Sequence, residues 1–194
     1  YAPTGQVRIE APIPGAKFVG IEIPNEYLNV VDFDEMWKQY QKLKLDYKLP
    51  VLLGVDAKSE GQFRDFADLG NIIMAGTTGS GKSVFNNCLI WSLISTYSPD
   101  KLKLLITDVK RVEFTGYNGI PYLTDNVHVE NEDVFSSLED MINGRRNREK
   151  LSKGKKTPYI VMIIDTFVDM MMWDAARFEK IMEELLPNSS EYGI

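Results

Sequence analysis

A glycine-rich segment of eight residues constrains the fold of this chain more than any other feature. Residues 76–83, GTTGSGKS, fit the pattern G-x-x-x-x-G-K-[ST]. An apolar run at residues 71–75 precedes the segment, and a largely apolar stretch at residues 84–97 follows it. A buried strand that turns through glycines into a helix presents backbone N–H groups and a helix N-terminus to an anion. The segment therefore predicts a phosphate-binding loop between a buried parallel strand and a helix.

Each residue type in this loop suits the binding of a nucleoside triphosphate. Glycines let the backbone wrap closely around a phosphate chain, Lys82 adds a positive charge at the β and γ phosphates, and the Ser83 hydroxyl can ligate Mg²⁺. An ordinary glycine loop is the alternative, but it does not account for the strand and helix patterns on either side. The predicted cofactor-binding residues are Gly76, Thr77, Thr78, Gly79, Ser80, Gly81, Lys82, Ser83 and Val84.

A second apolar run, residues 159–164, ends at Asp165. A buried strand of this kind can deliver an aspartate beside a phosphate loop, where it holds magnesium through its water shell. An apolar strand that ends in aspartate is a weak signal alone and a strong one together with the loop. We therefore predict ATP and Mg²⁺ as cofactors, with Ser83 and Asp165 as the metal-binding residues and Lys82 and Asp165 among the catalytic ones.

The remaining patterns predict an α/β fold with a mostly parallel sheet. Residues 102–106 form another non-alternating apolar run, and helical patterns cover residues 84–97, 131–151 and about 175–186. Strands that alternate with helices of this length favour parallel strands with right-handed crossovers.

The N-terminal part has a different organisation. Residues 1–31 alternate short apolar runs with proline and glycine, which predicts two antiparallel strands. An amphipathic helix is expected from residue 32 to before Pro50, with Trp37 and Tyr40 in a buried stripe rather than an aromatic binding face. Further short strands are expected at residues 51–55 and 62–67.

The charge and composition of the chain exclude few classes of function. The net charge of −6 argues at first sight against a nucleic-acid partner, and the single cysteine excludes an internal disulfide. No apolar run approaches the roughly 20 residues of a membrane span. However, residues 144–158 contain seven basic residues and one acid, so the two signs are segregated. This stretch either contacts a phosphate backbone or is a solvated helix end with a flexible loop. The basic residues are Arg145, Arg146, Arg148, Lys150, Lys153, Lys155 and Lys156.

Several segments, in this order, resemble the motor region of the FtsK/SpoIIIE family of DNA translocases. They are VRIEAPIPG at residues 7–15, VGIEIPN at 19–25, AGTTGSGKSV at 75–84, GIPYL at 119–123, and the run from residue 158 to residue 171. The similarity covers nearly all of the chain. A set of separate motifs in the right order is far more specific than the phosphate loop, which many ATPase families share.

The resemblance implies a RecA-like P-loop NTPase core, preceded by a small strand-rich segment and a helix. Residues 1–49 would then be the end of the preceding motor subdomain with its connecting helix, and residues 50–194 the nucleotide-binding domain, incomplete at its C-terminal end. It further implies a hexameric ring around double-stranded DNA that converts ATP hydrolysis into movement, during chromosome segregation at cell division. The chain would be a cytoplasmic domain of a membrane-anchored bacterial protein, with the anchor in segments absent here.

The chain departs from the family pattern at one catalytic position. The family has glutamate after the aspartate that ends the second apolar run, whereas Thr166 follows Asp165 here. A threonine hydroxyl cannot accept a proton near neutral pH as a carboxylate can, so we hypothesise that ATP–Mg²⁺ binds but is hydrolysed poorly. Asp169 is interpreted as structural rather than as a replacement base. A nucleotide-binding, non-catalytic ring subunit or structural adaptor is therefore the alternative function.

The loop that follows the apolar run at residues 102–106 has two possible interpretations. Asp108, Lys110 and Glu113 either face the nucleotide or a neighbouring subunit, or they lie in a solvated loop.

Overall fold

The computed structural model describes residues 7–13, 17–24, 30–151, 157–165 and 167–194, and its contacts divide the chain into two units, Tyr1–Asp32 and Phe33–Ile194. In the first unit, β1 (Arg8–Glu10) pairs with β2 (Gly20–Glu22) in an antiparallel register that places Ile9 opposite Ile21. The prediction of two antiparallel strands in this region is therefore confirmed.

The second unit begins with a helix on a hairpin. Helix α1 (Phe33–Leu43) has acidic residues in its first turn and a lysine in its last, which complements the helix dipole. It packs on the antiparallel pair β3 (Pro50–Val55) and β4 (Gly61–Asp65). Trp37 is buried and stacks on Tyr40, which confirms that these aromatic side chains form a packed stripe.

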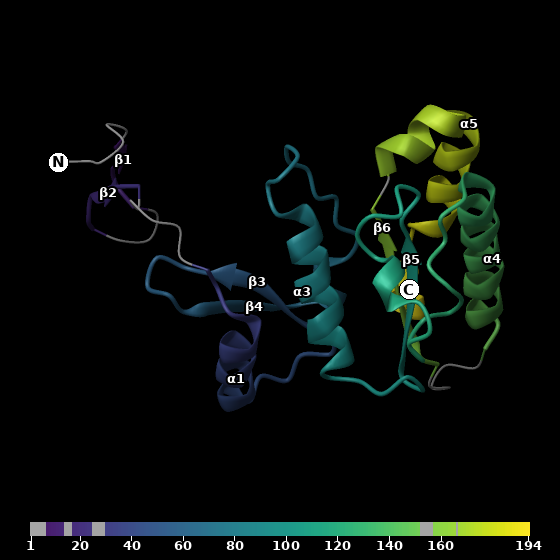
Figure 1. The fold of residues 1–194 in the computed structure, drawn as a ribbon. Coiled ribbons are helices and arrows are strands. Elements are labelled where there is room, and N and C mark those ends of the chain that lie inside the picture. Colours follow the sequence, from purple (N-terminus) through teal and green to yellow (C-terminus); the bar gives the residue numbers. More distant parts are fainter. Residues whose placement is uncertain (1–6, 14–16, 25–29, 152–156, 166) are drawn as a thin grey trace. The chain divides into compact units, whose positions relative to one another are not determined.

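The main core is built around two parallel strands, β5 (Leu102–Thr107) and β6 (Tyr159–Ile164), which pair in register along their whole length. Alternate residues of β6 enter two different apolar clusters. Val161 and Ile163 pack with α3 (Lys82–Ile94), whereas Met162 and Ile164 pack with the helices on the other face. Figure 1 shows this layered arrangement, with α3 on one side of the strands and, on the other, α4 (Asn131–Glu149) and α5 (Phe167–Leu185).

Helices α4 (Asn131–Glu149) and α5 (Phe167–Leu185) form the outer layer and pack against each other through Phe135 and Phe178. Both aromatic side chains are fully buried. The short elements are α2 (Phe66–Leu69) and the 3₁₀ helices η1 (Thr115–Tyr117) and η2 (Ser189–Tyr192).

The predicted strand at residues 71–75 is not formed, so this prediction was wrong. The segment pairs with no strand in the described part of the chain, and Ile73 remains 83% exposed. An extended segment becomes part of a sheet only when a neighbouring strand satisfies its backbone groups. Among the residues that the structure describes, β6 pairs only with β5, and a cavity lies between β6 and this segment.

Helix α5 begins earlier than the predicted residue 175. It starts at Phe167 and is interrupted at Asp174, whose φ of −152° and ψ of 84° are not helical. The Asp174 carboxylate accepts a hydrogen bond of 3.0 Å from the Arg177 backbone N–H, as an N-cap does. The sequence pattern therefore identified the second half of α5, which follows this internal cap. None of the helices in the described ranges is long and apolar enough to cross a bilayer.

Candidate functional site

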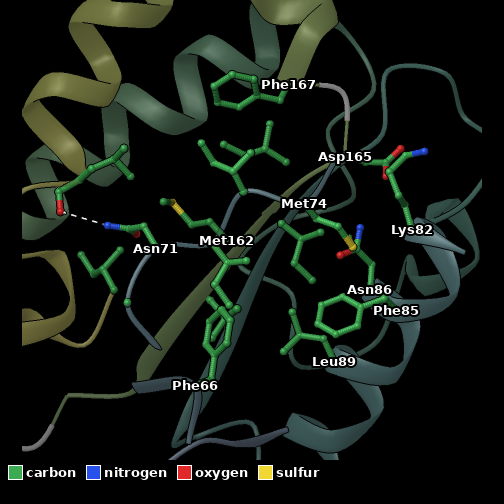
Figure 2. A pocket seen from close by; sticks show the side chains of 18 of the residues that line it. Phe66, Asn71, Met74, Lys82, Phe85, Asn86, Leu89, Met162, Asp165 and Phe167 are labelled. Atoms are coloured by element: carbon green, nitrogen blue, oxygen red, sulfur yellow. Dashed lines mark hydrogen bonds between the residues drawn. The ribbon is translucent and has the colours of Figure 1, made fainter. Parts of the chain in front are cut away.

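The site lies in a cavity of about 640 Å³ between residues 70–76, helix α3, strand β6 and the start of α5. Most of its walls are apolar. Its polar end contains Gly76, Lys82 and Asp165, and Figure 2 shows Lys82 and Asp165 close together at the end opposite Phe66.

The loop at the polar end is closely wound and requires glycine. A Cβ atom added to Gly76 would lie 2.4 Å from the Ser80 hydroxyl oxygen, so a side chain there would collide with the loop itself. Gly81 has a φ of 93°, a left-handed conformation that glycine adopts without steric cost. It precedes the first residue of α3, and no side chain caps this helix N-terminus. The first backbone N–H groups of α3 are therefore available to an anion.

Lys82 is folded back onto its own loop. Its ammonium donates hydrogen bonds to the carbonyl oxygens of Gly76, at 2.8 Å, and Thr77, at 2.9 Å. These two bonds hold the positive charge over the loop, where phosphate oxygens would be stronger acceptors than neutral carbonyls. Ser83 follows in the first turn of α3 and is partly buried.

Asp165 lies at the carboxyl end of β6, and its environment disfavours negative charge. Desolvation raises the pKa of Asp165, and the nearby carboxylates of Asp108 and Glu113 raise it further. The ammonium groups of Lys110 and Lys82 act in the opposite direction. A cation bound here would relieve this repulsion.

The loop after β5 is organised by Asp108, which is fully buried. Its carboxylate accepts backbone hydrogen bonds from Val112, Glu113 and Phe114, at 3.3, 2.9 and 2.8 Å. This loop carries Lys110 to the cavity wall, where its Nζ atom lies 3.0 Å from the Asp169 Oδ2 atom in the first turn of α5.

The segment at residues 71–75, which precedes the loop, is hydrogen-bonded to the C-terminal part of the chain. The Asn71 side-chain amide donates to the Leu186 carbonyl oxygen, at 3.3 Å, and to the Ser189 hydroxyl, at 3.4 Å. The first of these bonds is drawn in Figure 2.

The structure brings Gly76 and Lys82 of the predicted loop to the same end of one cavity as Asp165. The other predicted loop residues, Ser83 among them, do not line this cavity. Sequence reasoning did not find the buried role of Asp108 or the ion pair between Lys110 and Asp169. A carboxylate directly after a buried strand and before a polar loop was the available signal for Asp108. Four predicted residues, Thr166, Lys153, Lys155 and Lys156, lie outside the described ranges. Val84 is described and is 66% exposed at the start of α3.

The residues present fit a magnesium-bound nucleoside triphosphate. The uncapped helix N-terminus and Lys82 provide positive potential for phosphates. Ser83 and Asp165 are oxygen ligands of the kind Mg²⁺ prefers. No cluster of three or more His, Cys, Asp or Glu side chains suited to a metal occurs in the described ranges.

Comparison with known proteins identifies relatives across most of the chain. A sequence model of the FtsK/SpoIIIE family matches residues 34–157. The chain is 39% identical over 145 residues to the DNA translocase FtsK of Chlamydia pneumoniae, a match that covers 75% of the chain and 18% of the relative. It is 38% identical over 185 residues to the DNA translocase FtsK of Clostridium tetani, covering 86% of the chain and 25% of the relative. The chain thus spans about a quarter or less of the length of these curated relatives.

Solved structures share the fold at lower sequence identity. ATPases 2 and 3 of Thermomonospora curvata EccC, in complex with a signal sequence peptide, match with a TM-score of 0.64 at 16% identity, over 76% of this chain and 28% of that one. The pCW3 conjugation coupling protein TcpA, in its monomer form with ATPγS, matches with a TM-score of 0.57 at 20% identity, over 92% of this chain and 55% of that one. These matches show the P-loop ATPase fold.

Proposed function

Because the chain belongs to the FtsK/SpoIIIE family, we propose that it is the ATP-binding part of a motor that moves double-stranded DNA. The observation that carries this proposal is the placement of Lys82 and Asp165 at one end of the same cavity, beside an uncapped helix N-terminus. The relatives from Chlamydia pneumoniae and Clostridium tetani are DNA translocases, which supports DNA as the partner.

The proposed mechanism assigns a role to each residue at the polar end. ATP bound with Mg²⁺ supplies the phosphoanhydride bond whose cleavage drives movement. The backbone N–H groups of residues 76–83 and the N-terminus of α3 orient the phosphates. Lys82 exchanges the Gly76 and Thr77 carbonyl oxygens for phosphate oxygens, and Ser83 and Asp165 hold the metal and its water shell.

Family membership and the charge distribution support the proposed assembly. We propose that the full protein forms a hexameric ring around double-stranded DNA and works in chromosome segregation at cell division. The chain would be a cytoplasmic domain, attached to the membrane by polypeptide outside residues 1–194. Residues 50–194 are proposed as the RecA-like nucleotide-binding domain, incomplete at its C-terminal end, and residues 1–49 as the end of the preceding subdomain with its connecting helix.

The basic segment at residues 144–158 is the proposed DNA contact. Arg148 already has structural partners, since it donates to the Tyr192 and Gly193 carbonyl oxygens at 2.8 and 3.2 Å. Arg145 and Arg146 pair with Glu149 and Glu184. These interactions favour Lys153, Lys155 and Lys156 as the groups that contact phosphates.

A second candidate function follows from Thr166, which replaces the carboxylate expected of a hydrolytic site. In this alternative the chain binds ATP–Mg²⁺ as a regulatory ring subunit or structural adaptor and turns it over poorly.

Nucleotide binding and ATP turnover, each with and without double-stranded DNA, separate these functions. We expect the chain to bind ATPγS with Mg²⁺ and to bind it about 10- to 100-fold more weakly in Lys82→Ala. DNA-stimulated turnover would support the motor, whereas binding without stimulation would support the non-catalytic subunit. Absence of nucleotide binding by the wild-type chain would overturn both proposals.

A further inference from the structure

The ion pair between Lys110 and Asp169 joins two segments that both reach the proposed phosphate site. Lys110 belongs to the loop after β5, and Asp169 belongs to the first turn of α5. Both residues line the cavity that contains Lys82 and Asp165. The pair therefore lies in the wall of the proposed nucleotide site.

The backbone that carries Lys110 is fixed, while its side chain has room to move. The buried Asp108 carboxylate accepts three backbone hydrogen bonds from residues 112–114, and the Asp108 carbonyl oxygen accepts one from the Arg111 N–H at 2.9 Å. By contrast, the Lys110 side chain is 65% exposed and its contact with Asp169 is a single ion pair. Such exposed ion pairs contribute little to stability, so the ammonium can change partners at low cost.

Lys110 and Lys82 both reach the cavity that Asp165 lines. The Lys110 Nζ atom lies 3.0 Å from the Asp169 Oδ2 atom, and Asp169 also lines this cavity. Lys82 is proposed to bind the phosphates nearest the loop, because it extends from the loop itself. Lys110 reaches the cavity from the loop after β5, the strand that pairs with β6, and Asp165 lies at the end of β6. A residue that held Mg²⁺ would lie near the terminal phosphates of a bound triphosphate, because the metal would neutralise the charge there.

We propose that Lys110 is a second phosphate-binding lysine, which exchanges Asp169 for the terminal phosphate and so makes the site discriminate ATP from ADP. This inference rests on the proposed nucleotide-binding function. Asp169 is then a competitor that holds Lys110 when the terminal phosphate is absent. A diphosphate, which ends before the Asp165 side, leaves the Lys110–Asp169 pair in place.

The test measures dissociation constants for ATPγS and ADP, each with Mg²⁺, in four variant chains and compares each of them with the wild-type chain. In Lys110→Gln we expect ATPγS affinity to fall about tenfold, the loss of one charge-assisted hydrogen bond, while ADP affinity stays within about twofold. In Asp169→Asn we expect ATPγS to bind about threefold more tightly, because the competitor for Lys110 is weakened. In the double variant, Asp169→Asn should have no further effect. Lys38→Gln, an exposed lysine of α1, is the matched control and should leave both constants unchanged.

The outcomes distinguish this inference from the proposed function. Equal losses for ATPγS and ADP in Lys110→Gln would show a general electrostatic effect and overturn the inference, as would unchanged affinity for both. A wild-type chain that binds neither nucleotide would contradict the proposed function itself. Melting temperatures of all four chains establish that each is folded, and Lys110→Gln is expected to fold because the side chain is exposed.

Discussion

The Lys82 ammonium donates a hydrogen bond of 2.8 Å to the carbonyl oxygen of Gly76, six positions earlier in the same loop. The positive charge of the loop is therefore satisfied internally before any phosphate binds. Because the acceptors are two neutral carbonyls, a phosphate can replace them with a net gain in interaction.

Lys82→Ala tests this exchange. We expect nucleotide affinity to fall by about 10- to 100-fold, corresponding to the loss of charge-assisted hydrogen bonds, while the melting temperature changes little because Lys82 is not buried. Titration with a fluorescent ATP analogue measures the affinity, and Lys38→Gln is the control. Unchanged affinity in Lys82→Ala would contradict the assigned role of the loop.

Asp165→Asn tests whether the ionised Asp165 carboxylate lowers the stability of the folded protein. The pKa of Asp165 is raised in the folded protein above the ordinary aspartate value of 3.8, so the ionised carboxylate destabilises the folded state at pH 7. We expect Asp165→Asn to have a higher free energy of unfolding than the wild type at pH 7. The difference should shrink as the pH falls through the raised pKa, because the wild-type carboxyl then becomes neutral in the folded state.

Denaturant unfolding at pH 7 and at successively lower pH measures this effect. Magnesium-dependent ATPγS binding should be lost in the same variant, which separates the functional cost from the gain in stability. A less stable Asp165→Asn at pH 7 would refute the electrostatic argument.

Asp108→Ala tests whether the loop after β5 depends on its buried carboxylate. Removing the acceptor leaves three backbone N–H groups, of residues 112–114, without this partner. We expect the free energy of unfolding to fall by about 2 kcal/mol, since the bond from the Phe114 N–H is buried, whereas those from Val112 and Glu113 are only partly buried. Urea unfolding measures the change, with Asp140→Ala on the exposed face of α4 as the control. Equal stability of the two variants would be inconsistent with the structural role.

Phe178→Ala tests the packing between α4 and α5. The Phe178 side chain is fully buried and meets Phe135 edge to face, with ring centroids 6.2 Å apart. We expect a loss of about 3–5 kcal/mol on truncation, which lowers the melting temperature by roughly 2–4 °C per kcal/mol in a chain of this size. Trp173→Ala, also in α5 but 65% exposed, should change stability by less than about 0.5 kcal/mol.

Thr166→Glu tests whether the missing carboxylate limits hydrolysis. If a general base is lacking, the variant should raise ATP turnover by about 10²-fold or more. Thr166→Gln, which has a side chain of similar size but no carboxylate, is the control and should stay at the wild-type rate. If the wild-type chain turned over ATP as fast as Thr166→Glu, the hypothesis of slow hydrolysis would be wrong.

Local sequence patterns correctly predicted those core strands that have a neighbouring strand to pair with. The runs at residues 102–106 and 159–164 became β5 and β6 because each provides the other with a parallel partner, and helices cover both faces. The run at residues 71–75 has the same apolar character, but it lacks a paired strand in the described part of the chain. An apolar run indicates burial, and it carries no information about whether a partner strand lies beside it.

The candidate site was predictable where its residues are close in sequence. The loop at residues 76–83 contains its own glycines, lysine and serine, so one short pattern identified them. The ion pair of Lys110 with Asp169 depends on how β5 and α5 lie together in the fold, which no local pattern records. For Asp108, the position directly after a buried strand indicates a special carboxylate, but it does not identify the backbone N–H groups of residues 112–114 as its partners.

The one-sided pairing of β6 has a consequence for handling the protein. In the described residues, β5 satisfies one edge of β6, while on the cavity edge the Ile160 N–H donates to the Gly193 carbonyl oxygen at the strand's beginning. An incompletely paired strand edge is a template for another extended chain. Any such association would stabilise the folded form by mass action. A melting temperature of this chain should therefore be given together with the protein concentration at which it was measured.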